Sequence, residues 1–357
     1  MTQDVQKKRR LALALFFTLI AVTFAISQML RHGAFERLQD SRPPVAYEET
    51  FSVFGTYGKL TLWAEPDIAE PCAEKVITSL QSLHNRLNLF DPDSELSRLN
   101  DKAGEEFVEC SPQLWDLLTV CREGYIKTNG AFDITVGPLM QLWGFHGERK
   151  TLPTSAEIRN TLDSVGMDKV LFEDSRQAVK LTKPGMYLDF GGVAKGYAVD
   201  LAARIMTSHT ITMGLIDLGG NIRCLSNPPP GKQYYSVGIR HPFDKRNLLG
   251  TVHVTNSAIA TSGNYEQSRR LEGELVHHIV DPRTGQPVRD VASVTVITPC
   301  GADSDIFSTA VFVDGPALAR TLKDATRRTS ILRVELDERG EAHVDSYGWV
   351  WQDVSLR

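Results

Sequence analysis

Residues 186–200 read MYLDFGGVAKGYAVD, an apolar run that passes through a glycine pair into a helical pattern. The β-prone residues 186–190 predict a strand, and apolar residues at helical spacing over 193–205 predict a helix with one buried face. At such a strand–turn–helix junction, unpaired backbone N–H groups and the helix dipole favour a bound anion. A glycine turn alone is weak support for a ligand, because many such turns only reverse the chain.

The composition is that of an ordinary globular protein, with 357 residues, 42% of them hydrophobic, and a net charge of −5. This length suffices for one large or two ordinary domains. Because there is no large basic excess, the chain is not expected to bind nucleic acid. The cysteines are Cys72, Cys110, Cys121, Cys224 and Cys300. None forms a Cys-x-x-Cys pair, so we expect small buried side chains rather than a zinc site or a disulfide framework.

The N-terminal segment predicts a membrane anchor. Residues 7–10 are all basic, and residues 11–30 contain no charge. A helix of that length spans about 30 Å, the thickness of the hydrocarbon core. The basic flank holds its end in the cytoplasm and sends the remainder across. A cleaved signal peptide is the alternative, although Thr23-Phe24-Ala25 is a poor cleavage site. The predicted organisation is a cytoplasmic tail (1–10), an anchor (11–30), a linker (31–48) and a globular domain (49–357).

Short strands and separate helices alternate irregularly along the globular part. Helices are predicted over 71–88, 112–130 and 155–165 and from about residues 305 and 316. The second of them has an N-cap serine, Ser111, followed by Pro112. Strands are predicted over 60–64, 169–172, 178–182, 215–218, 235–240, 251–254, 257–261 and 294–298. Because there is no regular βαβ alternation and no internal repeat, we predict an α+β domain, one compact unit with two lobes.

Six loop motifs occur in a fixed order along the chain. They are GAFD (130–133), LDFGGVAKG (188–196), DLGGN (217–221), ATSGNY (260–265), HHIVDPRTG (277–285) and ADSDIFSTA (302–310). Together they resemble the ApbE family, the FAD:protein FMN transferases, over about residues 50–340. The Asp-Phe-Gly tripeptide at 189–191 also occurs in protein kinases, but no His-Arg-Asp loop or glycine-rich nucleotide loop accompanies it here.

The resemblance implies a two-lobed, T-fold-related domain and a specific reaction. Such an enzyme takes FAD as substrate and moves its FMN half onto a serine or threonine of another protein, releasing AMP. It requires a divalent metal, usually Mg²⁺. The expected partner carries a Ser/Thr-Gly-Ala-Ser/Thr motif and is a subunit of a membrane electron-transfer complex. The expected location is the bacterial inner membrane, with the catalytic domain in the periplasm.

A magnesium site is expected near the last motif. Asp305 and Thr309 are four residues apart on a predicted helix, so both side chains project from one face. The resemblance implies that they bind the metal together with the carbonyl of Gly192. Many relatives have a second aspartate where this chain has Ser308. Ser308 is therefore a further candidate ligand, which could bind the metal or position a water. The alternative roles are structural, with Asp305 as an N-cap and Thr309 facing the core.

The resemblance also assigns residues to FAD. The cofactor-binding set is Phe54, Phe90, Ala131, Phe132, Asp133, Asp189, Lys195, Ser262 and Val280. Phe54 and Phe90 stand where the family often has Met and Tyr, and both keep an apolar face for a flavin or adenine ring. His278 and Asp305 are the predicted catalytic residues. The ordinary pKa of histidine suits proton transfer near neutrality, although His278 could instead be a plain strand residue.

Two other functions use the same residues. An FAD pyrophosphatase would let water attack in the same pocket and yield FMN and AMP. A membrane-tethered FAD-binding or flavin-carrying protein would need no chemistry on a partner. A self-modified carrier would need an acceptor motif of its own, and neither Asn129-Gly-Ala-Phe132 nor Thr261-Ser-Gly-Asn264 fits one. We therefore expect the chain to act on another protein.

Overall fold

The computed structural model describes residues 22–24, 27–28, 45–244, 246–325, 328–336 and 342–348. Most of the predicted anchor and linker lies outside these ranges. Within them, no helix combines the length and the apolarity that a bilayer crossing requires. The chain divides into two units, Met1–Val45 and Ala46–Arg357, and every strand of the described residues belongs to the second.

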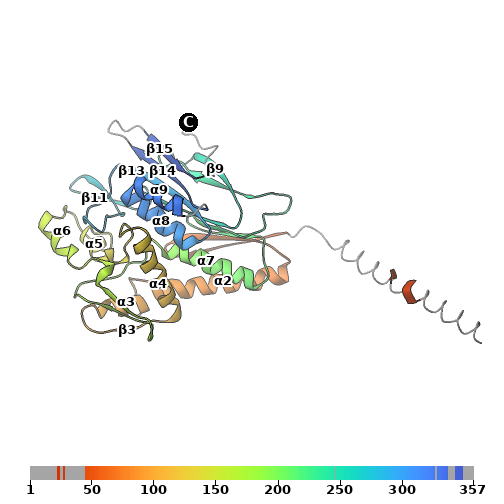
Figure 1. Ribbon diagram of the computed structural model, residues 1–357, viewed down its shortest axis with the longest axis horizontal. Coiled ribbons are helices and arrows are strands. Elements are labelled where there is room, and N and C mark those ends of the chain that lie inside the picture. Colours follow the sequence, from red (N-terminus) through yellow and green to blue (C-terminus); the bar gives the residue numbers. More distant parts are fainter. Residues whose placement is uncertain are drawn as a thin grey trace, which may run out of the picture. The chain divides into compact units, whose positions relative to one another are not determined.

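An eight-stranded antiparallel sheet forms the centre of this unit (Figure 1). Its strands, in spatial order, are β1 (Ala46–Val53), β2 (Thr56–Trp63), β6 (Gly214–Leu218), β7 (Asn221–Cys224), β10 (Ser257–Gly263), β13 (Val291–Thr298), β14 (Ser330–Leu336) and β15 (Ala342–Tyr347). All eight residues of β13 are buried, as expected of a central strand covered on both faces. The strand β1 begins inside the stretch predicted as linker, because its pairing with β2 extends to Ala46 opposite Trp63.

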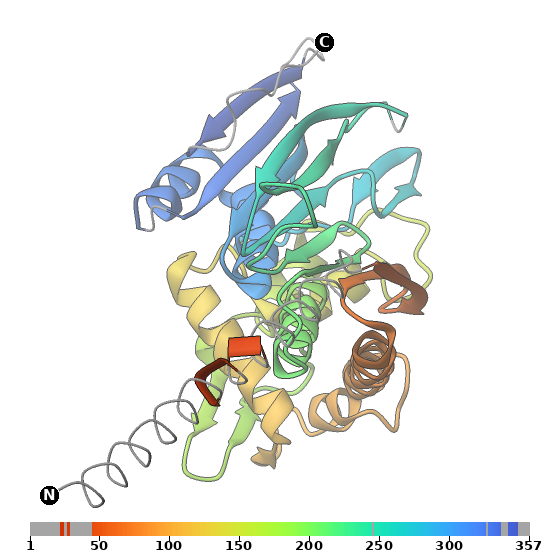
Figure 2. The same ribbon diagram turned by 90° about the vertical axis from the view of Figure 1, so that its right-hand side faces the viewer.

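Helices cover one face of this sheet and a β-hairpin covers the other. Helices α2 (Pro66–Leu87), α7 (Ala194–Ser208) and α8 (Gly301–Asp314) pack on the first face, with α9 (Pro316–Ala325) beside α8 (Figure 2). On the second face, β8 (Tyr235–Arg240) and β9 (Leu248–Val254) share a hydrophobic cluster with sheet residues such as Ile259 and Leu332. The sheet is thus the middle layer of the structure.

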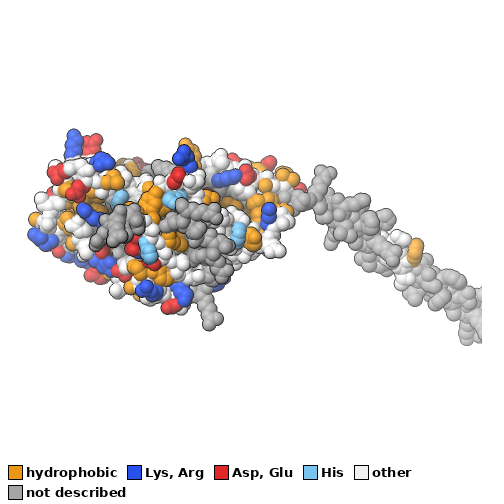
Figure 3. All heavy atoms as spheres, turned by 90° about the horizontal axis from the view of Figure 1, so that it is seen from above, with side chains coloured by type: hydrophobic (Ala, Val, Ile, Leu, Met, Phe, Trp, Pro, Cys, Tyr) orange, Lys and Arg blue, Asp and Glu red, His pale blue; other side chains and the backbone are white. Residues whose placement is uncertain are grey.

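A second set of elements packs beside the helical layer. It comprises α3 (Glu95–Asp101), α4 (Pro112–Lys127), α5 (Gly137–Leu142), α6 (Ser155–Leu162), the small sheet of β3 (Val108–Glu109), β4 (Val170–Glu173) and β5 (Ala178–Leu181), and the hairpin β11 (Ser268–Leu271) and β12 (Glu274–His277). The predicted cap of α4 is confirmed, since the Ser111 hydroxyl accepts a hydrogen bond from the Leu114 N–H at 3.3 Å. On the face seen in Figure 3, acidic, basic and apolar side chains are interspersed among the residues drawn in colour.

The strand predicted over residues 186–190 is wrong. This segment belongs to no strand ladder. The side chain of Asn100 takes the place of a neighbouring strand, accepting from Leu188 N at 2.8 Å and donating to Leu188 O at 3.1 Å. The next N–H, that of Asp189, donates to the carbonyl of Ile134 at 2.8 Å. These bonds satisfy the backbone and hold Asp189 in a fixed loop.

Two predicted helix starts are also wrong. The helix predicted from 71 begins at Pro66, and Pro71 lies inside it. The helix predicted from about 305 begins at Gly301, because the carboxylate of Asp200 on α7 accepts from Gly301 N at 2.8 Å and Ala302 N at 3.0 Å. A cap supplied from about a hundred residues away leaves no local signal. Asp305 therefore lies inside α8 and is not its N-cap.

Candidate functional site

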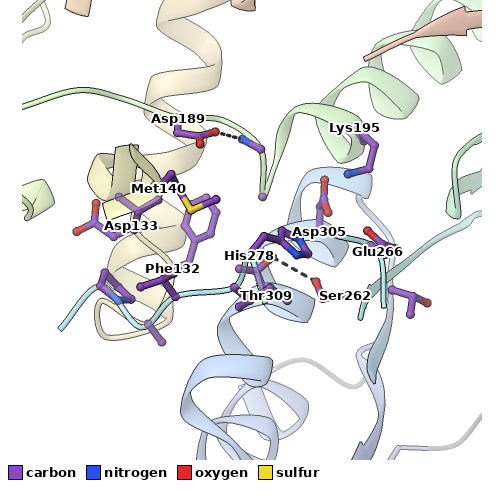
Figure 4. A pocket seen from close by; sticks show the side chains of 18 residues that line it. Phe132, Asp133, Met140, Asp189, Lys195, Ser262, Glu266, His278, Asp305 and Thr309 are labelled. Carbon is purple, nitrogen blue, oxygen red and sulfur yellow. Dashed lines mark hydrogen bonds between the residues drawn. The ribbon is translucent and has the colours of Figure 1, made fainter. Parts of the chain in front are cut away.

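A cleft opens where the glycine turn at residues 190–193, the end of β10, the segment after β12 and α8 meet (Figure 4). Its empty volume, including the part open to solvent, is about 760 Å³. Of the predicted site residues, it is lined by Ala131, Phe132, Asp133, Asp189, Gly192, Lys195, Ser262, His278, Val280, Asp305 and Thr309. Phe54, Phe90 and Ser308 do not line it.

Asp305 is buried on α8, with 5% of its surface exposed. One carboxylate oxygen, Oδ2, accepts hydrogen bonds from Gly196 N and from Asn221 Nδ2, both at 2.9 Å. The hydrogen bonds found among the described residues leave Oδ1 without a donor. Because Asp305 lines the cleft, this oxygen is available to a ligand there.

The close crossing of α7 and α8 allows the bond from Gly196. A Cβ at Gly196 would lie 2.3 Å from the carbonyl oxygen of Gly301, and a Cβ at Gly301 would lie 2.4 Å from the carbonyl oxygen of Gly196. Only glycine permits this approach of two helix backbones. The glycine at 196 in the LDFGGVAKG motif thus positions the carboxylate of Asp305.

Thr309 lies one helical turn beyond Asp305 and faces the glycine turn. A Cβ built on Gly192 would lie 3.3 Å from Thr309 Oγ1, so the backbone of the turn packs directly against this hydroxyl. Ser262 Oγ lies 3.3 Å from Thr309 Oγ1 and 2.8 Å from Ser308 Oγ. Ser308 is fully buried and donates to the carbonyl of Asp305 at 2.9 Å, which keeps it out of the cleft.

These groups fit a magnesium ion. A carboxylate and a hydroxyl are hard oxygen ligands, and Mg²⁺ commonly uses one or two carboxylates together with waters and substrate phosphates. Among the described residues there is no cluster of three or more His, Cys, Asp or Glu side chains that could hold a metal. A metal site here would therefore have Asp305 as its charged ligand. Ser308 would not bind the metal directly, and its hydroxyl contacts that of Ser262.

His278 follows β12 and enters the cleft, whereas His277 does not. The ring nitrogen Nδ1 of His278 lies 3.1 Å from the carbonyl oxygen of Gln267. Because a carbonyl only accepts, Nδ1 carries the hydrogen, and Nε2 remains free to accept a proton. Desolvation lowers the pKa of His278, so its ring is neutral at neutral pH. This is the protonation state that a general base requires.

Asp189 is held by a network that the sequence did not reveal. Its Oδ1 accepts from Gly191 N at 2.7 Å, and its Oδ2 lies 3.1 Å from His146 Nε2. The other ring nitrogen of His146 lies 2.5 Å from the hydroxyl oxygen of Tyr187. The ring of Phe90 stands edge-on to His146, with centroids 5.8 Å apart. Phe90 thus reaches the site only through His146, which lies in a stretch without any recognisable motif.

Asp133 and Phe54, both predicted to bind FAD, make contacts within the protein fold. The Asp133 carboxylate caps a short 3₁₀ turn, accepting from Thr135 N at 2.8 Å and from Met167 N at 3.0 Å. Its pKa is raised, mainly by burial. Phe54 lies in the β1–β2 turn and packs edge-on against His84 with ring centroids 5.3 Å apart. The sequence prediction placed Phe54 against FAD, and the structure places it outside the cleft.

Several lining residues were missed. They are Val136, Met140, Gly191, Thr261, Glu266, Ile279 and Pro282. Glu266 directly follows the ATSGNY motif, so its position beside a predicted site loop could have marked it as a lining residue. Desolvation raises its pKa, and the nearby positive charge of Lys195 partly offsets this effect.

Comparison with known proteins agrees with this geometry. Residues 54–332 match the model of the ApbE family. The chain is 32% identical over 275 residues to the FAD:protein FMN transferase of Escherichia coli K12, covering 75% of this chain and 77% of that protein. The ApbE protein of Thermotoga maritima superposes with a TM-score of 0.76 at 31% identity, covering 84% of this chain and 96% of that one. The flavin transferase ApbE of Vibrio cholerae superposes with a TM-score of 0.75 at 26% identity, covering 85% and 98%. The chain belongs to the ApbE family.

Proposed function

We propose that this chain is an FAD:protein FMN transferase that moves the FMN moiety of FAD onto a serine or threonine hydroxyl of an acceptor protein. The observation that carries the proposal is the convergence of three groups in one cleft. The Asp305 carboxylate, the Thr309 hydroxyl and the neutral ring of His278 come from separate motifs and line the same cavity. The names of the similar proteins support the choice of reaction.

The transfer is a displacement at phosphorus. The acceptor oxygen forms a bond to the phosphorus of the FMN half, and the bond from that phosphorus to the bridging oxygen breaks, so that AMP leaves with the bridging oxygen. Nε2 of His278 takes the proton of the acceptor hydroxyl. A bound Mg²⁺ would neutralise the charge on the pyrophosphate and on the departing phosphate. Asp305, Thr309 and the Gly192 carbonyl would hold it.

The rest of the cleft suits the two ends of FAD. Phe132, Met140 and Val280 supply apolar surface for a ring system. Lys195 brings a positive charge to the opposite wall, beside Asp305 and Glu266 (Figure 4). A cation there attracts a phosphate before any chemistry begins. The cleft therefore has an apolar part that suits the flavin ring and a charged part that suits the pyrophosphate of FAD.

A labelling experiment separates the proposed function from its alternatives. The purified chain is incubated with FAD, Mg²⁺ and a small carrier protein bearing a grafted Thr-Gly-Ala-Thr loop. Transfer predicts a fluorescent flavin band on the denatured carrier and one AMP per flavin attached. A carrier with Ala-Gly-Ala-Ala in the same loop should stay unlabelled. Free FMN and AMP without a label would identify a pyrophosphatase, and bound FAD without turnover would identify a carrier.

We also propose that the catalytic domain works in the periplasm, tethered to the bacterial inner membrane, on a subunit of a membrane electron-transfer complex. The basic residues 7–10 and the uncharged stretch 11–30 support this location. Membrane fractions should contain the chain, and protease added to spheroplasts should remove its catalytic domain. Recovery of the chain in the cytoplasmic fraction, protected from protease, would contradict the proposal.

A further inference from the structure

A second cleft adjoins the first and shares Thr261 and Glu266 with it. It lies between the sheet and the hairpin on the second face of the sheet, and its empty volume, including the part open to solvent, is about 1240 Å³. We call it the β8 groove. It is lined by Thr50 of β1, residues 57–59 of β2, Asp217, Gly219, Gly220 and Ile222 around the β6–β7 turn, residues 237–240 of β8, Ile259 and Thr261 of β10, and Tyr265 and Glu266. The two shared residues place the groove directly beside the candidate active site.

The two clefts adjoin at the second half of β10, which contains the shared residue Thr261. The strand β7 pairs with β10 only over residues 257–259, whereas β13 pairs with β10 as far as Gly263. Beyond Ile259, one edge of β10 thus has no paired strand among the described residues. Successive side chains of β10 point to opposite faces of the sheet. Ser262 Oγ lies 3.3 Å from Thr309 Oγ1 on the helical face, and Thr261 Oγ1 lies 2.8 Å from Thr295 Oγ1 of the neighbouring strand β13. The unpaired edge of β10 therefore lies where the two clefts adjoin.

The walls of the groove suit an extended peptide. Among the described strands, β8 pairs only with β9. Four successive residues of β8, from Val237 to Arg240, line the groove, so the strand presents its backbone there. Such an edge can bind an added strand through backbone hydrogen bonds. The opposite wall contains Gly220, where no atom outside its chain neighbours lies within 4 Å of the position that a Cβ would take, so a bound backbone can approach closely there.

The charges in the groove are balanced. Lys59 and Arg240 face the same space as Asp217 and Glu266. A site for a second nucleotide or a free phosphate would need an excess of positive charge, and this groove has none. Tyr57, with 82% of its surface exposed, adds an amphipathic ring of the kind that anchors protein contacts. These features favour a polypeptide over a small anion.

We propose that the β8 groove binds the acceptor segment of the partner protein as an extended strand beside β8 and passes its hydroxyl over Thr261 and Glu266 into the active site. This inference rests on the proposed transferase function and adds where the acceptor binds. It assigns the two substrates to different faces of the sheet, with FAD on the helical side and the acceptor on the hairpin side.

The test uses the full chain and the carrier protein with the grafted Thr-Gly-Ala-Thr loop. Two variants alter groove residues that do not line the FAD cleft, Tyr57→Ser and Lys59→Glu. The matched control is Arg246→Glu, since Arg246 is 92% exposed near the β8–β9 turn and does not line the groove. Each groove variant should raise the KM for the carrier about tenfold, the loss of one good interface contact. The Kd for FAD should stay at the parent value.

Each outcome decides one question. A raised carrier KM with an unchanged Kd for FAD, seen in the groove variants and absent from Arg246→Glu, supports the groove. If the parent labels the carrier and both groove variants do so with the parent KM, the acceptor binds elsewhere and the inference is wrong. If the parent labels no carrier at all, the proposed function fails and the groove assignment falls with it.

Discussion

Asp305→Asn is expected to lower kcat/KM for flavin transfer about 10³-fold, because a carboxylate that holds a catalytic metal supplies several kcal/mol of transition-state stabilisation. The asparagine oxygen can still accept from Gly196 N and Asn221 Nδ2, so the crossing of α7 and α8 keeps its hydrogen bonds. The group that then faces the cleft is an amide NH₂, which donates hydrogen bonds and cannot bind a cation. The loss should therefore concern chemistry and not folding.

Asp303→Asn is the matched control on the same helix. Asp303 lies two residues before Asp305, pairs with Lys127 at 3.7 Å and does not line the cleft. It should leave kcat/KM within about twofold of the parent, because Asp303 lies outside the cleft and its ion pair with Lys127 is partly exposed to solvent. EDTA should abolish transfer by the parent and added Mg²⁺ should restore it. Full transfer by Asp305→Asn, or by the parent in EDTA, would contradict the metal assignment.

The sequence predicted those parts of the site that lie within single motifs. Asp305 and Thr309 are spaced by one helical turn, so their common direction followed from α-helix geometry alone. The residue pair Ser111 and Pro112 marked the start of α4 for a similar local reason. The family resemblance carried by the six motifs predicted which loops would meet in the cleft, and all six contribute a lining residue or a hydrogen bond to one.

What the sequence did not predict depends on contacts between distant residues. Residues 186–190 have the composition of a strand, but Asn100 supplies their hydrogen bonds and no strand lies beside them. The start of α8 is set by Asp200, on another helix. His146 reaches Asp189 across more than forty residues, and no pattern in its own stretch marks it. Such pairings become visible only when the chain is folded.

His278→Ala is expected to lower the rate constant of transfer about 10²–10⁴-fold, the usual contribution of a general base. His277→Ala is its control, because this neighbour lies outside the cleft and its Nδ1 is 3.0 Å from the carbonyl oxygen of Asn264. The control should keep most of the activity. An equal loss in both variants would point to damage of the loop, and full activity in His278→Ala would exclude a base role.

The pH dependence of transfer gives a readout that structural damage would not reproduce. Desolvation, with Lys195 and His277 adding positive charge nearby, lowers the pKa of His278 below its ordinary value of about 6.5. The active form is the neutral ring, so the rate constant should be constant above that lowered pKa and should fall as the pH drops through it. In His278→Ala the remaining slow transfer should lose this acid limb. A parent acid limb centred at or above the ordinary value would mean that another group carries the proton, and Glu266, whose pKa is raised beside the same substrate route, would then be the side chain to replace.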